Sequence, residues 1–194
     1  MSKEEELLNL SQIIAKCHRC ELAKTRNHVV VGEGNINSKI MLVGEGPGYN
    51  EDMTGHAFVG KAGQLLDREL ASIGLDRKVV YIANIVKCRP PQNRNPLPKE
   101  QEACINFLRK QFLIQRPRLI ILLGAIAARK MIASDFKITL EHGKIIEKKG
   151  VIFVGTFHPS ALLRDPAKKK LAWEDLKTIR KIIEDNKLLL FDNQ

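Results

Sequence analysis

Four short apolar segments alternate with longer stretches of helical periodicity, and this alternation restricts the fold more than any other feature of the sequence. The segments read KIMLV, VVYIANIV, RLIILL and VIFVG and cover residues 39–43, 79–86, 118–123 and 151–155. Continuous apolar strands separated by helices are typical of a parallel sheet that helices cover on both faces. The sequence therefore predicts an α/β fold, a three-layer α/β/α sandwich with a central, mainly parallel four-stranded sheet.

Helix signals and chain length complete this expectation. Ser2 and Glu5 match a capping box, which predicts that a first helix runs from there to about Lys16. A chain of 194 residues suits a single domain, residues 1–194, better than two. Residues 145–147 are a candidate edge strand. Further helices are expected at residues 60–73, 99–115, 125–133 and 168–185.

The composition is strongly basic, with a formal charge of +10 from 32 Lys and Arg against 22 Asp and Glu. This excess favours a polyanionic partner, because neutralised phosphates release condensed counterions, although a merely soluble basic surface has the same composition. No apolar run is long enough for a transmembrane helix, and the N-terminal MSKEEELLNL is acidic where a signal peptide is basic. We therefore expect a cytoplasmic protein without a membrane segment. The high content of Lys, Arg and Glu is typical of a thermophile.

Three unusual loops follow three of the predicted strands. They read GEGPGYNED, NIVKCRPP and TFHPS, and they begin at Gly44, Asn84 and Thr156. In open α/β sheets, ligands bind beyond the carboxyl ends of the strands. The first loop matches neither a P-loop nor GxGxxG, so a tight structural turn is its alternative interpretation. We predict a ligand site where the three loops converge.

Phe58 stands among glycines in GHAFVGKAG rather than in an apolar periodic run. A phenylalanine is usually a core residue, but one in such a loop suits a stacking platform for a nucleic-acid base. The following VGKAG would place backbone amides at a helix start, where a phosphate can bind. Phe58 and Lys61 are therefore candidates for contact with nucleic acid.

The four cysteines form two pairs, a CxxC pair at Cys17 and Cys20 and a wider pair at Cys88 and Cys104. Structural disulfides are rare in the cytosol, and CxxC lets two thiolates reach one metal. Four thiolates suit zinc or an iron–sulfur cluster equally. Buried cysteines without a metal are the alternative, which explains neither the CxxC spacing nor the even number.

Three motifs in this order, together with the cysteines, resemble one known family. GEGPGYNEDMTGHAFVGKAGQLLD, NIVKCRPPQNRNP and HPSALLR are similar to the family 4, thermostable iron–sulfur uracil-DNA glycosylases, and the likeness covers about residues 17–164. The resemblance implies a monofunctional enzyme that flips uracil out of DNA and hydrolyses its N-glycosidic bond, in base excision repair of deaminated cytosine. The rival functions are a non-catalytic four-cysteine module that binds nucleic acid and a glycosylase with a broader base preference.

The resemblance also implies roles for individual side chains. Phe58 would stack on the flipped uracil, and the Asn84 amide would read the uracil edge, because an amide offers both a donor and an acceptor. Glu51 would sit near uracil C5 and exclude the methyl group of thymine. His158 would donate a hydrogen bond to uracil O2 as negative charge develops there. Without the resemblance, Asn84 reads as a strand-end cap and Glu51 as a solvated loop carboxylate.

Other residues would contact DNA or act on water. Ser160 would hold a backbone phosphate, and residues 161–164, which end in Arg164, would approach the minor groove. Gly46 occupies the place where better-known uracil glycosylases carry an aspartate that supports the attacking water. Glu45 beside it would either act on the water or brace the loop by accepting amide hydrogen bonds.

The resemblance decides between the metals in favour of a [4Fe–4S] cluster. It would be held by all four thiolates and would pin the N-terminal segment to the proline-rich loop. We expect a monomer that acts on uracil-containing DNA, single- or double-stranded.

Overall fold

The computed structural model describes residues 1–189 and is built around a six-stranded sheet with the order β1-β3-β2-β4-β6-β5. The four inner strands are parallel, as predicted, and antiparallel strands β1 and β5 close the two edges. The predicted number of four strands is therefore too low: β5 lies at the candidate edge strand, whereas β1 is two residues long and leaves no periodic signal. The strands are β1 Glu33–Gly34, β2 Ile40–Gly44, β3 Tyr81–Asn84, β4 Leu119–Leu123, β5 Ile145–Lys148 and β6 Val151–Thr156.

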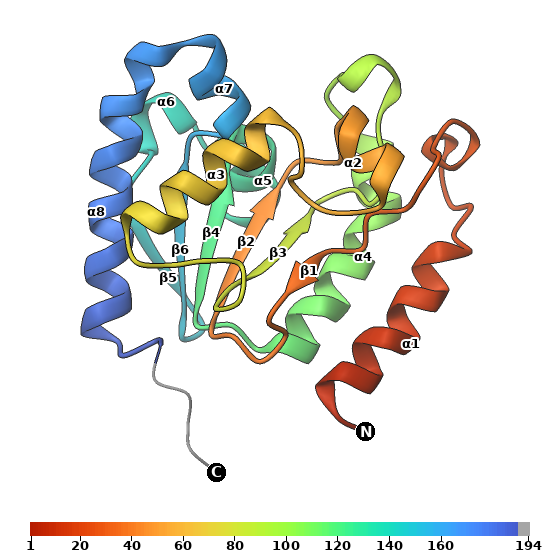
Figure 1. The fold of residues 1–194 in the computed structure, drawn as a ribbon, viewed down its shortest axis with the longest axis horizontal. Helices are drawn as coiled ribbons and strands as arrows, with labels where there is room; N and C mark the ends of the chain where they lie inside the picture. Colours follow the sequence, from red (N-terminus) through yellow and green to blue (C-terminus); the bar gives the residue numbers. More distant parts are fainter. Residues whose placement is uncertain (190–194) are drawn as a thin grey trace.

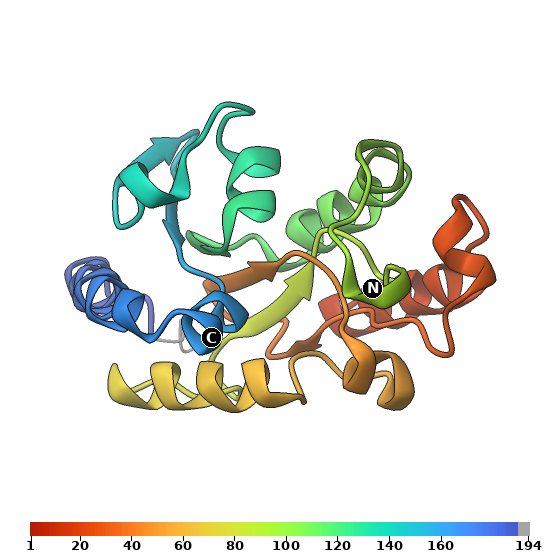
Figure 2. The same cartoon turned by 90° about the horizontal axis from the view of Figure 1, so that it is seen from above.

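Helices cover both faces of this sheet and make the three predicted layers (Figures 1 and 2). Helices α3 and α8 pack on one face, and α1, α4 and α5 lie on the other. The helices are α1 Lys3–Ala15, α2 Tyr49–Thr54, α3 Lys61–Ser72, α4 Pro98–Gln115, α5 Ala125–Met131, α6 Ile138–Glu141, α7 Pro159–Arg164 and α8 Lys169–Asp185, with short 3-10 turns at Glu21–Lys24, Pro91–Asn93 and Pro166–Lys168.

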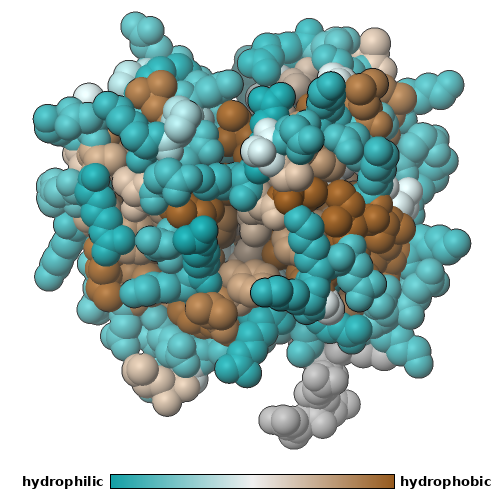
Figure 3. Space-filling model, turned by 180° about the vertical axis from the view of Figure 1, so that it is seen from behind, coloured by the Kyte–Doolittle hydropathy of each residue, from teal (hydrophilic) through white to brown (hydrophobic). Residues whose placement is uncertain are grey.

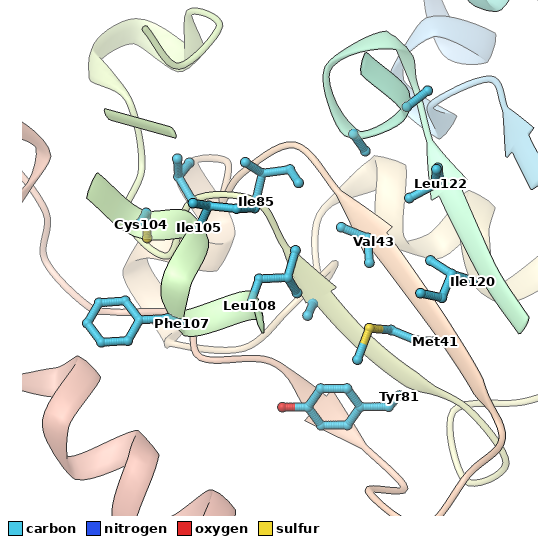
Figure 4. Packing of buried hydrophobic residues seen from close by; sticks show 14 of the residues in the cluster. Met41, Val43, Tyr81, Ile85, Cys104, Ile105, Phe107, Leu108, Ile120 and Leu122 are labelled. Atoms are coloured by element: carbon cyan, nitrogen blue, oxygen red, sulfur yellow. The ribbon is translucent and has the colours of Figure 1, made fainter. Parts of the chain in front are cut away.

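The two cores follow from strand alternation. In β2, Met41 and Val43 point into the layer of α4, while Ile40 and Leu42 point into the layer of α3 and α8. Figure 4 shows the first of these cores, in which Leu108 of α4 lies over the β2 side chains. Because both faces of the inner strands are buried, these strands are apolar throughout.

The predicted capping box is present at the start of α1. The hydroxyl of Ser2 accepts from the N–H of Glu5 at 3.2 Å, and the Glu5 carboxylate accepts from the N–H of Ser2 at 2.8 Å. Across residues 1–189, no helix combines the length and the apolarity required to span a bilayer. Hydrophilic side chains dominate the back of the molecule, and apolar side chains reach that surface in smaller groups (Figure 3).

Two short helices occupy segments that the sequence predicts as loops. Helix α2 begins after Gly48 within GEGPGYNED, and α7 begins at Pro159 within TFHPS. Each has six residues, which is too short for apolar periodicity to be visible. Both lie beyond the carboxyl ends of strands, α2 after β2 and α7 after β6, so each carries side chains toward the same edge of the sheet.

Candidate active site

A cavity of about 650 Å³ opens at the carboxyl ends of the parallel strands, where the three predicted loops converge. The residues predicted to bind uracil or to act on water line it, and so do Lys61, Ser160, Ala161 and Arg164 among those predicted to contact DNA. Leu162 is buried, and neither it nor Leu163 lines the cavity. The individual roles stay predictions. From the segment that runs from the end of β2 through α2 to the start of α3 come Glu45, Gly46, Glu51, Phe58 and Lys61; from β3 comes Asn84; from α7 and its cap come His158, Ser160 and Arg164.

Phe58 and His158 face each other inside this cavity. Their ring centroids lie 5.6 Å apart with planes tilted by 30°. Phe58 is only 5% exposed, and its φ of +53° lies in the left-handed region that bulky residues avoid. At the end of β2, a Cβ on Gly44 would lie 2.6 Å from the Phe58 ring and 2.5 Å from Asn84 Oδ1. A glycine is thus required for these two side chains to converge.

Asn84 ends β3 and is buried, with 2% of its surface exposed. Among residues 1–189, no donor reaches its Oδ1 atom. A buried acceptor without a partner costs free energy, and such an atom beside a cavity is suited to a ligand N–H. A strand-end cap, the alternative interpretation of Asn84, would instead use the side chain on the protein's own backbone.

Glu51 does not lie in solvent, so the interpretation as a solvated loop carboxylate is wrong. The side chain is on α2 and is 9% exposed. One oxygen accepts from the N–H groups of Val59 at 2.8 Å and Gly60 at 2.9 Å, and the other accepts from the N–H of Gly48 at 3.1 Å. Glu51 therefore ties the start of α2 to the start of α3 and also lines the cavity.

His158 caps α7 and is held through one ring nitrogen. Its Nδ1 accepts from the backbone N–H of Ser160 at 3.1 Å and lies 2.8 Å from the Ser160 hydroxyl. Burial, together with the positive charge of Arg164, lowers the pKa of His158 to about 4, against a smaller opposing effect of Glu51. The ring is therefore neutral at physiological pH, and because Nδ1 is an acceptor, the proton is assigned to Nε2.

Glu45 differs from Glu51, because among residues 1–189 no donor bonds its carboxylate. Burial raises the pKa of Glu45, and the charge of Arg164 partly opposes this shift. Of the two roles expected for Glu45, bracing the loop by accepting amide hydrogen bonds falls to Glu51 in the structure. Gly46 has no room for a side chain, since a Cβ there would lie 2.6 Å from a Val86 methyl.

The rim of the cavity carries cations and polar groups. Lys61 and Arg164 are exposed at the start of α3 and the end of α7. The rim also includes residues that the sequence did not single out, although the run QNRNP after Cys88 is a visible polar signal. They are Asn93, Arg94 and Asn95 of the proline-rich loop and Arg129 of α5.

All four cysteines line a second, small cavity. Cys88 and Cys104 are buried, Cys17 and Cys20 are half-buried, and all four are free thiols. The backbone N–H of Lys87 donates to Cys104 Sγ at 3.3 Å. Within residues 1–189, no three His, Cys, Asp or Glu side chains are spaced to hold one metal ion. The thiols thus surround a space without converging on a point.

Comparison with known proteins agrees with this geometry. The model of the Uracil DNA glycosylase superfamily matches residues 31–177, so the chain belongs to that superfamily. It is 43% identical to a type-4 uracil-DNA glycosylase of Thermotoga maritima over 189 residues, 95% of this chain and 98% of the relative. It is 40% identical to the type-4 enzyme of Archaeoglobus fulgidus over 196 residues, 97% and 98% of the two chains. A type-5 uracil-DNA glycosylase of Pyrobaculum aerophilum is 33% identical over 146 residues, 66% of this chain and 64% of the relative. Within the superfamily, the chain is a member of the type-4 family.

Proposed function

We propose that this chain takes a flipped uracil into the cavity between β2, β3 and β6 and hydrolyses the bond between the base and deoxyribose. The observation that carries this proposal is the convergence of Phe58, Asn84 and His158 on one cavity, with the Oδ1 atom of Asn84 left unpartnered. Uracil-containing DNA is the polyanion that the charge of +10 favours. The product is an abasic site, the first intermediate of base excision repair.

Recognition of the base rests on three side chains. The Oδ1 atom of Asn84 would accept from uracil N3–H, and the amide nitrogen would donate to O4. The Phe58 ring would stack on the base. Glu51, held in place by three backbone N–H groups, would stand near C5 and exclude the methyl group of thymine.

The bond-breaking step rests on His158. As the glycosidic bond breaks, negative charge moves onto the base, and the Nε2–H group would donate to uracil O2 where that charge develops. The contact of Nδ1 with Ser160 fixes the ring before the reaction, so the donor needs no reorganisation. Because a pKa near 4 keeps the ring neutral, its Nε2–H is only weakly acidic and donates a hydrogen bond without transferring its proton to the base.

Water and DNA contacts come from the neighbouring residues. Glu45, whose carboxylate has no protein donor among residues 1–189, would orient the attacking water. Lys61, Ser160 and Arg164 would contact the DNA backbone at the rim. The reaction is a hydrolysis and uses no amine nucleophile, so strand cleavage by lyase chemistry is not expected.

We propose that a [4Fe–4S] cluster is bound between the four cysteines that line the second cavity. Cys17, Cys20, Cys88 and Cys104 would hold it, because four thiols surround a shared space and a cubane takes one thiolate at each of four irons. A single zinc would require the thiols to converge on one point. When bound, the cluster supplies cross-links between the segment after α1, the proline-rich loop and α4.

Base release from defined oligonucleotides tests the function. We would incubate the protein, without added metal, with labelled DNA that contains one uracil and with matched strands that contain thymine or hypoxanthine. The expected result is an alkali-labile site at uracil alone. DNA binding without base release would support a non-catalytic module instead, and equal release of hypoxanthine would support a glycosylase of broader preference.

A further inference from the structure

Arg77 lies outside the cavity, in the connection between α3 and β3, yet it contacts the segment that carries Phe58. Its Nη1 atom donates to the carbonyl of Ala57 at 2.7 Å, and its Nη2 atom donates to the carbonyl of Phe58. The guanidinium thus holds two successive peptide groups. Neither Ala57 nor Phe58 belongs to a helix or a strand, so no regular backbone hydrogen bonding fixes them.

Two carboxylates hold Arg77 in this position. Glu33 Oε1 accepts from Nη1 at 2.7 Å, and Asp67 Oδ1 accepts from Nε at 2.7 Å. The second oxygen of Glu33 also accepts from the N–H of Ala57 at 3.3 Å. Glu33 therefore binds the N–H of Ala57, and Arg77 binds its carbonyl. A lysine could not replace this guanidinium, because an ammonium carries its three N–H groups on one nitrogen, whereas a guanidinium presents N–H groups from three nitrogens in one plane.

The backbone that Arg77 holds is an unfavourable one. A φ of +53° at a phenylalanine is maintained only where the surroundings determine it. Helix α3 contributes to this, since a Cβ on Gly63 would lie 1.6 Å from the Phe58 carbonyl oxygen, and only glycine admits that oxygen. The same backbone geometry turns the Phe58 ring toward His158, 5.6 Å away.

We propose that Arg77 is a positioning residue, which holds the Phe58 ring in the orientation that stacks on uracil. This inference rests on the proposed role of Phe58 in the cavity. Arg77 does not line the cavity, and it acts through the carbonyls of Ala57 and Phe58. Loss of the fork would let residue 58 leave its left-handed conformation and move the ring away from the base.

A double-mutant cycle between Arg77 and Phe58 tests the proposal with the full-length, cluster-containing protein. Single-turnover rates on uracil DNA and the inhibition constant of free uracil would be measured for Arg77→Met, Phe58→Leu and the double variant. Stacking on one aromatic side chain is worth about 5- to 150-fold. We expect Arg77→Met to lower the rate and weaken uracil inhibition about tenfold in the wild type, and less than about twofold in the Phe58→Leu background.

Matched variants keep the test decisive if Arg77→Met does not fold. Arg77→Lys keeps the charge near Glu33 and Asp67 but not the fork, so it should lose most of the same effect. Arg180→Met, which removes an exposed arginine paired with Glu184 on α8, should change neither readout. Thermal unfolding of each variant checks that the fold is retained.

The possible outcomes separate this inference from the proposed function. If Phe58→Leu lowers the rate but Arg77→Met and Arg77→Lys do not, the positioning role is wrong and the cavity assignment stands. The same holds if the loss caused by Arg77→Met is equal in both backgrounds. If Phe58→Leu itself changes neither the rate nor uracil inhibition, the role of Phe58 is wrong, and the positioning role is overturned with it.

Discussion

The Nδ1 atom of His158 accepts a hydrogen bond from the backbone N–H of Ser160 at 3.1 Å, so the proton of the neutral ring is assigned to the other nitrogen. The interaction is an N-cap, so the same histidine starts α7 and, in the proposed mechanism, would present a donor to the base. A single contact within the motif HPS therefore sets the tautomer, the ring orientation and the start of the helix.

The free energy of unfolding should depend on pH through His158. Its pKa is about 4 in the folded protein and 6.5 when unperturbed, so the unfolded chain binds this proton more tightly. The contribution of His158 to the free energy of unfolding is complete above pH 6.5 and is lost as the pH falls through 4. His158→Asn keeps a capping acceptor but removes the titration. Urea unfolding between pH 8 and 5 should show the stability of the wild type falling relative to the variant. Parallel curves would contradict the assignment.

The side-chain amide of Asn84 should determine which base the protein releases. Asn84→Asp replaces the donor that would meet uracil O4 with an acceptor, while cytosine carries an exocyclic amine at that position. We expect a weaker release of uracil and a measurable release of cytosine from matched oligonucleotides. Full activity and selectivity for uracil in this variant would show that the uracil edge is read elsewhere.

The cysteines should hold iron. The purified protein is expected to be brown, with broad absorption near roughly 400 nm and about four irons per chain. Cys88→Ala should lose the absorption and lower the thermal unfolding temperature, because ligation contributes folding free energy. Iron analysis and the visible spectrum check this directly. A colourless protein with stoichiometric zinc would overturn the cluster.

Much of the fold was predictable because its signals are local. The four inner strands are apolar runs, and α3, α4 and α8 are long enough for helical periodicity, so their predicted ranges agree with the structure to within a few residues. The candidate site was predictable because strand ends meet at one edge of a parallel sheet. Motifs far apart in the sequence, such as GEGPG and HPS, therefore line the same cavity.

The remaining features depend on long-range contacts that have no sequence signal. Glu51 accepts hydrogen bonds from N–H groups at the start of another helix and so braces the cavity. The sequence predicted only a contact with the base for this residue. Arg77 is one of many basic residues in the sequence, and its hydrogen bonds to the carbonyls of Ala57 and Phe58 become visible only in the structure. Edge strand β1 forms because the sheet offers it a partner in β3, not because of its own two residues.

The carboxylate of Glu45 is expected to orient the attacking water. If it orients the water, Glu45→Gln should lower the single-turnover rate by an amount similar to His158→Ala, since no amide bond of the loop is lost with it. The gel-resolved rate of base release at saturating enzyme measures this. A loss far smaller than that of His158→Ala would show that Glu45 does not orient the water.

The central claim is that His158 stabilises the charge that develops on uracil O2, and His158→Ala tests it most directly. Removal of one preorganised donor of this kind typically costs about 100- to 1000-fold in rate, or roughly 3–4 kcal/mol. The decisive measurement is the single-turnover rate of uracil release at saturating enzyme, alongside the dissociation constant for the same DNA. We predict a fall of that size in the rate with little change in DNA affinity. An unchanged chemical rate in His158→Ala would contradict the account.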